Sequence, residues 1–156
     1  MGKNFYLTKE GLKKLKKEYQ SLKKFRFSKI NGEIPKILHS EEVNPEYLSF
    51  REDLSLIEKR IQEIENILKN VELIKPPAKS KQNAVDLGAK VTVEIDGEVD
   101  EFEIVGTLEA NPILGKISNE SPIGKALLGH QIGDEIIISS PIKVIYKIKK
   151  VEYLTS

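Results

Sequence analysis

Residues 47–71 read YLSFREDLSLIEKRIQEIENILKNV, and this stretch decides the fold of the first half of the chain. Its large apolar residues recur at alternating spacings of three and four: Tyr47, Phe50, Leu54, Ile57, Ile61, Ile64, Leu68 and Val71. Such a repeat keeps one seam of a helix facing a partner helix, as in coiled-coil packing. The pattern therefore predicts a helix that ends near Asn70 and a second helix for it to pack against.

The predicted partner helix lies upstream, where Thr8 fits the N-cap position. The same spacing then continues through Leu12, Leu15, Tyr19 and Leu22. Beyond residue 22 the pattern drifts through Phe25, Ile30, Ile34 and Ile37. Because a proline in a helix interior removes a hydrogen bond, we expect a kink near Pro35.

The turn between the two helices is predicted around residues 39–43. Asn44 and Pro45 follow it, and they fit an N-cap and the first helical position of the second helix. The first half of the chain is thus predicted to be a long antiparallel helical hairpin of roughly 40 Å, at a rise of about 1.5 Å per residue.

Charge is distributed unevenly, although the net charge of the whole chain is only +1. The first 30 residues are strongly basic, with Glu10 and Glu18 as their carboxylates, and residues 31–72 are predominantly acidic. One interpretation is that a basic helix pairs with an acidic helix across the seam. The other is that the lysines form a surface for phosphate groups, which bind such side chains without sequence specificity. Both interpretations stay open at this point.

The composition excludes several classes of protein. The chain has no cysteine, which excludes disulfides and cysteine-based metal sites. No stretch approaches the roughly 18 apolar residues that span a membrane, and no apolar core follows Lys3 as in a signal peptide. The sequence has no phosphate-binding loop and no dinucleotide fingerprint. We therefore expect a cytoplasmic protein that has no membrane partner and no catalysis of its own.

The second half of the chain changes character after a linker at residues 75–83, which contains Pro76 and Pro77. Strands are predicted at residues 90–95 and 102–105, joined by the hairpin-turn pair Asp96 and Gly97. A short strand near residue 117, a short helix at 121–129 and strands at 135–139 and 143–151 follow. The predicted domains are 1–74 for the hairpin and 84–156 for a small antiparallel sheet with one short helix, and the fold class is α+β.

The second half also carries a specific resemblance. The motifs that carry it are Ile104-Val105-Gly106, Glu109-Ala110, Gly115, Ile117-Ser118, Ser121-Pro122-Ile123-Gly124, Ala126-Leu127-Leu128-Gly129 and Gly133-Asp134. The first half adds Leu7-Thr8, Gly11, Leu15, Glu46-Tyr47 and Arg51-Glu52, in the same order and spacing. From about Phe5 to Leu154 the chain resembles the Gre family of bacterial transcription elongation factors.

This resemblance implies a fold, a partner and a division of labour. Gre factors have a coiled-coil N-terminal domain and an FKBP-like C-terminal domain that docks at the secondary channel of bacterial RNA polymerase. The coiled coil reaches the polymerase active site, where acids at its tip help to hold Mg²⁺ while the polymerase cleaves backtracked RNA. The implied partners are RNA polymerase and the 3′ end of nascent RNA. The implied factor is a monomeric accessory protein, not an enzyme, and when free it binds no cofactor.

The tip departs from the family pattern Gly-Asp-x-x-Glu-Asn-Ala-Glu-Tyr. Here Ser40-Glu41-Glu42-Val43-Asn44-Pro45-Glu46-Tyr47 is one or two residues shorter, and its two acids are adjacent. Either Glu41 and Glu42 still hold metal with the polymerase, because carboxylate oxygens suit Mg²⁺, or the tip enters the channel and inhibits or modulates the enzyme. Taken without the resemblance, two acids in an exposed turn are ordinary.

Two further sets of residues acquire roles from the resemblance. The basic patch that contacts RNA or polymerase would comprise Lys13, Lys16, Lys17, Lys23, Lys24 and Arg26, although a solvated helix face explains them equally well. Polymerase docking would involve Ser118, Ser121, Pro122 and Ile123, which also fit a strand end and a helix cap. Prolyl isomerase activity is not expected, because only three aromatic residues follow residue 84 and that activity needs an aromatic-lined pocket.

Overall fold

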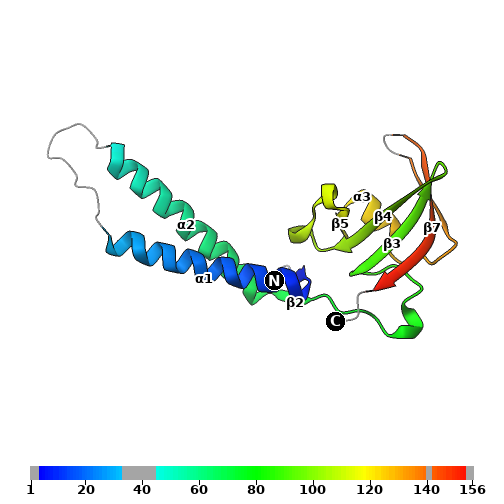
Figure 1. Cartoon of the computed structure of the whole chain (residues 1–156), viewed down its shortest axis with the longest axis horizontal. Coiled ribbons are helices and arrows are strands. Elements are labelled where there is room, and N and C mark those ends of the chain that lie inside the picture. The colour runs from blue at the N-terminus through cyan, green and yellow to red at the C-terminus, as the bar shows by residue number, and fades with distance from the viewer. Residues whose placement is uncertain (1–3, 33–44, 140–141, 154–156) are drawn as a thin grey trace. The chain divides into compact units, whose positions relative to one another are not determined.

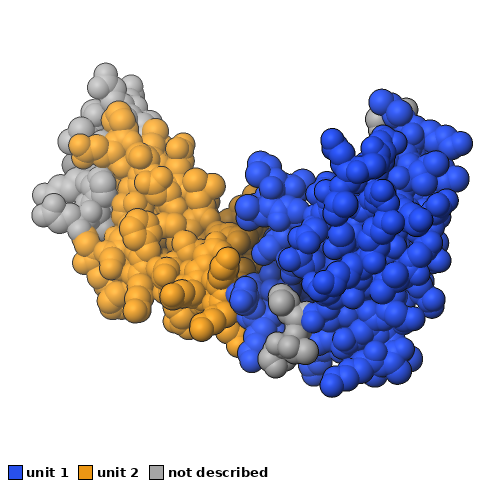
Figure 2. All heavy atoms as spheres, turned by 45° about the vertical axis from the view of Figure 1, so that its right-hand side comes forward, with its two compact units in different colours: residues 1, 3–11, 71–156 blue, residues 2, 12–70 orange. Residues whose placement is uncertain are grey.

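The computed structural model describes residues 4–32, 45–139 and 142–153 (Figure 1). The chain divides into two compact units, shown in separate colours in Figure 2. Residues 12–70 form one unit, which we call the hairpin unit, and residues 3–11 together with 71–156 form the other, which we call the sheet unit. The predicted linker at residues 75–83 lies inside the sheet unit, and the predicted domain division stays a prediction.

The hairpin unit consists of α1 (Lys9–Asn31) from its second turn onward and α2 (Pro45–Lys69), drawn side by side in Figure 1. Cross-helix pairs such as Glu18 with Arg60 and Lys29 with Asp53 show that the helices run antiparallel. The seam predicted for α2 is confirmed: Ile57, Ile61 and Ile64 are buried, and the adjacent Ile67, which the repeat did not include, is buried as well.

The seam of α1 differs from the prediction beyond residue 22. Arg26 and Lys29 continue the three-and-four spacing and are half-buried, whereas Phe25 and Ile30 are exposed. The apparent drift in the apolar pattern is therefore a switch from apolar to cationic residues on an unchanged seam. Ile34, Pro35 and Ile37 lie outside the described residues, and the predicted kink stays a prediction.

The sheet unit begins with a short ladder between the segment that precedes α1 and the segment that follows α2. β1 (Phe5–Leu7) pairs in parallel with β2 (Val71–Leu73), with Phe5 opposite Val71. The Ile74 N–H then donates a hydrogen bond of 2.8 Å to the Leu7 carbonyl oxygen. Leu7 is buried, so this ladder is anchored by packing as well as by hydrogen bonds.

The main sheet has the strand order β5-β4-β3-β7-β6. Its strands are β3 (Ala89–Ile95), β4 (Glu98–Val105), β5 (Lys116–Ser118), β6 (Glu135–Ile138) and β7 (Val144–Tyr153). The pairing is antiparallel except between β4 and β5, which makes the sheet mixed. Asp96 and Gly97, both at positive φ, form the turn between β3 and β4 as predicted.

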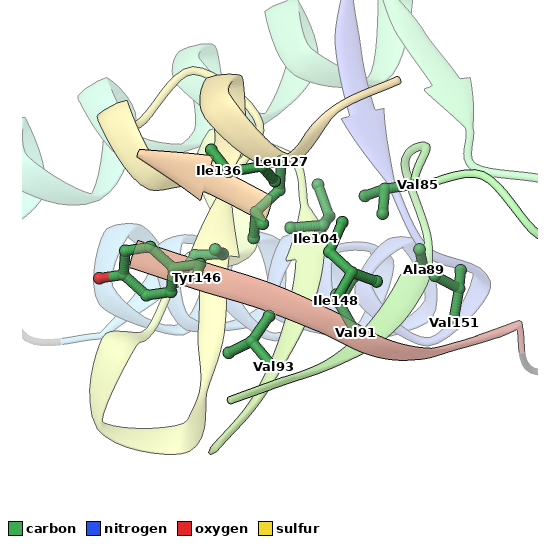
Figure 3. Close-up of a cluster of buried hydrophobic side chains, with 11 residues drawn as sticks. Val85, Ala89, Val91, Val93, Ile104, Leu127, Ile136, Tyr146, Ile148 and Val151 are labelled. Atoms are coloured by element: carbon green, nitrogen blue, oxygen red, sulfur yellow. The ribbon is translucent and has the colours of Figure 1, made fainter. Parts of the chain in front are cut away.

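Among the described residues of this unit, one short α-helix and three 3₁₀ turns accompany the sheet, and they confirm the α+β class. They are α3 (Pro122–Leu127), η1 (Lys79–Lys81), η2 (Thr107–Glu109) and η3 (Pro112–Leu114). Side chains from the sheet and from α3 form the core in Figure 3, including the fully buried Val91, Ile104, Leu127 and Ile148. Tyr146 belongs to this core.

None of the helices within the described ranges has the length and the apolar character needed to cross a lipid bilayer.

Candidate functional site

The predicted tip acids, Glu41 and Glu42, lie outside the described residues. What the structure describes is the helix that follows them: α2 begins at Pro45, and Glu46 lies in its first turn, where the helix dipole favours a carboxylate. Among residues 4–32, 45–139 and 142–153, no group of three or more acidic, histidine or cysteine side chains is arranged to hold a metal ion. The predicted metal ligands at the tip remain a prediction.

The lysines of the predicted basic patch share one exposed face of α1. Because residues three, four and seven apart lie on the same side of a helix, Lys13, Lys16, Lys17, Lys23 and Lys24 form a stripe along it, and all five are exposed. We call these five residues the basic stripe. Arg26, predicted with them, is half-buried and lies on the seam.

The ion pairs between α1 and α2 do not neutralise the basic stripe. Lys29 forms an ion pair with Asp53 at 3.4 Å, but within the described part of the chain none of the five stripe lysines pairs with a carboxylate. Lys23 instead holds its ammonium 5.0 Å from the centre of the Tyr19 ring. Pairing between a basic and an acidic helix therefore accounts for Lys29 and leaves the stripe available for an anionic partner.

Phe27 was missed as a candidate, although it ends the basic stripe. Its side chain is 70% exposed, and it lies four residues after Lys23 on the same ridge of α1. A hollow of about 410 Å³ there is lined by Lys23, Arg26, Phe27, Ile30, Asn31 and Glu58. The signal in the sequence is its phase, because Phe27 does not fall on the seam defined by Leu15, Tyr19 and Leu22.

Two polar contacts fix the two helices at mid-length. Arg60 donates to both carboxylate oxygens of Glu18, at 2.8 and 3.0 Å, and these hydrogen bonds lower the pKa of the Glu18 carboxyl, against the opposing effect of burial. The Tyr19 hydroxyl donates to Glu65 at 3.0 Å, which raises the pKa of Tyr19. A bidentate arginine contact sets geometry as well as charge, so the helices are held in a defined register.

The predicted docking residues gather at the start of α3. The Ser121 hydroxyl caps the helix by accepting from the Gly124 N–H at 3.0 Å, and it donates to the Ser118 carbonyl oxygen at 2.6 Å. A Cβ at Gly124 would lie 2.0 Å from that same carbonyl oxygen, so only glycine fits there. These contacts fix the start of α3 against the end of β5.

Of the four predicted docking residues, Pro122 is exposed and Ser118 is buried. The Ser118 hydroxyl shares a hydrogen bond with Thr107 at 2.9 Å and accepts from the Glu120 N–H at 3.0 Å. Ile123 is half-buried and packs against the core of the sheet unit. Ser118 can therefore support a surface formed by Pro122 but does not itself present one.

Two of the aromatic residues considered for an isomerase pocket have structural contacts. The Tyr153 hydroxyl donates to the Ala84 carbonyl oxygen at 2.5 Å and accepts from the Asp86 N–H at 2.9 Å, and burial raises the pKa of this tyrosine. Tyr146 lies in the core (Figure 3). These contacts assign both residues to the packing of the sheet unit.

Both halves of the chain match models of known protein families. Residues 5–73 match the family model described as "Transcription elongation factor, N-terminal", and residues 79–153 match "Transcription elongation factor, GreA/GreB, C-term". Together the two matches cover nearly all of the described residues.

Curated relatives agree with these matches. The transcription elongation factor GreA of Thermomicrobium roseum is 44% identical over 137 residues, which cover 86% of this chain and 88% of the relative. GreA of Clostridium acetobutylicum is 41% identical over 144 residues, 89% of this chain and 90% of the relative. Among solved structures, the GreA factor homolog 1 of Thermus thermophilus is 24% identical, with a TM-score of 0.42, over 96% of this chain and 99% of that chain. By its sequence matches, the chain belongs to the GreA/GreB family of transcription elongation factors.

Proposed function

We propose that this elongation factor binds bacterial RNA polymerase through its secondary channel and stimulates the cleavage of backtracked RNA by the polymerase. The observation that carries the proposal is a braced two-helix rod whose connecting segment, residues 33–44, contains Glu41 and Glu42. A rod of this kind can bring a pair of carboxylates to an active site that belongs to another protein. The chain is then an accessory factor and breaks no bond by itself.

Each unit has its own part in this proposal. The sheet unit docks on the polymerase through the corner at Pro122, which Ser118, Ser121 and Ile123 hold in place. The hairpin enters the channel, and Glu41 and Glu42 offer carboxylate oxygens to Mg²⁺ that is shared with the polymerase. When bound, this ion supplies the Lewis-acid chemistry of phosphodiester hydrolysis. The free factor is proposed to be a cytoplasmic monomer that binds no cofactor.

The basic stripe gives the hairpin a second task. Its five lysines lie on one exposed face without carboxylate partners in the described ranges, which suits the phosphates of the nascent RNA 3′ end or an acidic wall of the channel. Phosphate contacts of this kind weaken as salt rises. We assign Phe27, exposed at the end of the stripe, to the same surface, because aromatic side chains stack on unpaired bases.

A second candidate function is inhibition or modulation of the polymerase without stimulated cleavage. It is favoured by the tip itself, since Glu41 and Glu42 are adjacent and the two residues that separate the acids in the family pattern are absent. The two candidates share the docking step and differ only in what the tip does.

Transcript cleavage in a halted, backtracked elongation complex tests the proposal at fixed Mg²⁺. The factor is expected to speed the release of short 3′ fragments, and Glu41→Ala with Glu42→Ala is expected to abolish this effect while polymerase binding persists. Glu98→Ala with Asp100→Ala removes the same charge from the exposed part of β4 and serves as the control. Unaltered cleavage together with slower nucleotide addition would establish the second candidate, and lost binding in the tip variant would make the tip a docking element.

A further inference from the structure

The first turn of α1 is capped by a carboxylate from the distant part of the chain. Thr8 precedes the helix, and its hydroxyl oxygen accepts a hydrogen bond from the Gly11 N–H at 3.0 Å, as an N-cap residue does. Glu109 in η2 accepts two hydrogen bonds from the same threonine, from its backbone N–H at 2.7 Å and from its hydroxyl at 2.6 Å. The cap therefore depends on Glu109 as well as on Thr8.

Gly11 leaves the space that this carboxylate occupies. A Cβ at residue 11 would lie 2.2 Å from Glu109 Oε1 and 2.4 Å from Glu109 Cδ, distances that real Cβ atoms do not reach. The backbone conformation at residue 11 does not require glycine, because its φ is not among the positive values found at Gly88, Gly97 and Gly115. Its role is to admit the Glu109 side chain against the helix.

A backbone contact beside it brings the same two segments together. A Cβ at Gly106 would lie 2.1 Å from the carbonyl oxygen of Tyr6, so the chain just before η2 lies directly against β1. Tyr6, Thr8, Gly11, Gly106 and Glu109 all belong to the sheet unit. The first turn of α1 is thus part of the sheet unit, whereas the rest of the same helix forms the hairpin.

Electrostatics favour this arrangement. The N-terminal end of a helix carries partial positive charge, and α1 is 23 residues long. A carboxylate there forms charge-assisted hydrogen bonds, which are shorter and stronger than neutral ones. Glu109 and Thr8 are both half-buried, so water competes only partly for these contacts.

We propose that Glu109 is a positioning residue for α1. Its carboxylate fixes the first turn of the helix to the sheet unit, and the effect of the factor on RNA polymerase requires this connection, whereas docking does not. The second half of this statement rests on the proposed function, and the first half rests only on the contacts of Thr8, Gly11 and Glu109. The physical reason is continuity: whatever the far end of α1 does in the polymerase, it does from a helix whose start Glu109 holds.

Amide hydrogen exchange of the full chain tests the cap. In Glu109→Ala the amides of Thr8 and Gly11 are expected to exchange about tenfold faster than in the parent chain, while those of Ile61 and Ile64 do not change. Glu109→Gln is expected to restore most of the protection, because its side-chain oxygen still accepts from the Thr8 N–H and its amide can donate to the hydroxyl. Glu98→Ala, which removes an exposed carboxylate at the start of β4, is the matched control. Unchanged exchange at Thr8 and Gly11 in Glu109→Ala would overturn the proposal.

Titration of each variant against a backtracked elongation complex tests the consequence, at a temperature well below the unfolding of every variant. Glu109→Ala is expected to lower the maximal effect on the polymerase about fivefold or more, with the half-effective concentration within about twofold of the parent value. Glu109→Gln is expected to recover that effect, which a loss of folded protein would not explain. An unchanged maximal effect, or a change confined to the half-effective concentration, would overturn the positioning role.

The two proposals fail in different ways. If the parent chain itself leaves cleavage and nucleotide addition unaltered, the proposed function is wrong, and the polymerase half of this proposal falls with it. The exchange measurement needs no polymerase and decides in either case whether Glu109 holds the first turn of α1.

Discussion

The seam between α1 and α2 has an apolar part and a polar part, and different chemistry holds the two helices together in each. Around Ile57, Ile61 and Ile64 the seam is apolar, and Ile64 has no exposed surface. Around Lys29 the seam is polar: its ammonium lies 3.4 Å from Asp53 and 5.0 Å from the centre of the Phe50 ring, and the Asp53 side chain is 56% exposed. Buried apolar surface stabilises strongly, whereas an exposed ion pair contributes about 0–1 kcal/mol.

The contrast shows where the stability of the hairpin lies. The isoleucine end adjoins the β1–β2 ladder, and the lysine end adjoins the segment with Glu41 and Glu42. The part of the seam that would enter a polymerase channel is therefore the part with the weaker intrinsic packing.

Truncation of Ile64 should produce the largest loss of stability. Ile64→Ala removes a fully buried side chain and leaves a cavity, which costs about 2–5 kcal/mol of unfolding free energy. Leu56→Ala is the matched control on the same helix; Leu56 is 66% exposed, and a change within about 0.5 kcal/mol is expected. Chemical denaturation followed by circular dichroism measures both, and equal midpoints for the two variants would contradict the large contribution assigned to the buried isoleucines.

Replacement of Lys29 by leucine should make the two parts more alike. The Lys29 side chain is only 18% exposed, so a leucine there would pack on Phe50 and extend the apolar seam. We expect Lys29→Leu to raise the unfolding free energy by about 1 kcal/mol. This is the gain from about one additional buried methylene group after the loss of the ion pair with Asp53 is subtracted. Lys24→Leu, on the exposed basic stripe, is the control and should leave stability unchanged. A lower midpoint for Lys29→Leu would mean that the contacts with Asp53 and Phe50 stabilise more than exposed pairs do.

Periodicity predicted the apolar part of the seam and misread the polar part. In α2 the spacing from Tyr47 to Leu68 is regular, because the residues that pack are also the apolar ones, whereas Val71, the last residue of the predicted repeat, lies in β2. In α1 Phe25 and Ile30 are apolar but exposed, while the seam continues through Arg26 and Lys29. A pattern based on hydrophobicity cannot follow a seam on which charged residues bury their aliphatic stems.

Contacts between distant parts of the chain could not be predicted from the sequence either. The turn at Asp96 and Gly97 was predicted because its signal is local, but β1 and β2 are only three residues each and pair across more than 60 residues. The hydrogen bonds from Thr8 to Glu109 span 101 residues and follow no period. Thr8 was predicted as an N-cap and Glu109 was singled out only through the family resemblance, and neither signal predicted their contact.

The pair between Glu18 and Arg60, which lies between the two parts of the seam, should have the smallest effect and a defined pH dependence. Because hydrogen bonds from Arg60 lower the pKa of the Glu18 carboxyl in the folded chain, the contribution of the pair is fully present above the ordinary pKa of 4.5. That contribution is lost as the pH falls through the lowered folded value. Both side chains are about 40% exposed, so solvent screening limits the effect to about 0.5 kcal/mol at neutral pH.

Denaturation of the parent chain and of Glu18→Gln between pH 7 and pH 3 measures this contribution. The two unfolding free energies should differ at neutral pH and converge as the pH falls below 4.5, because protonated Glu18 resembles glutamine in charge. Glu58→Gln, an exposed carboxylate on α2, controls for the general loss of negative charge. A parent chain that is less stable than Glu18→Gln at pH 7 would mean that the folded chain raises the pKa of Glu18. A difference of several kcal/mol at pH 7 would mean that the middle of the hairpin depends on this pair as strongly as one end depends on its isoleucines.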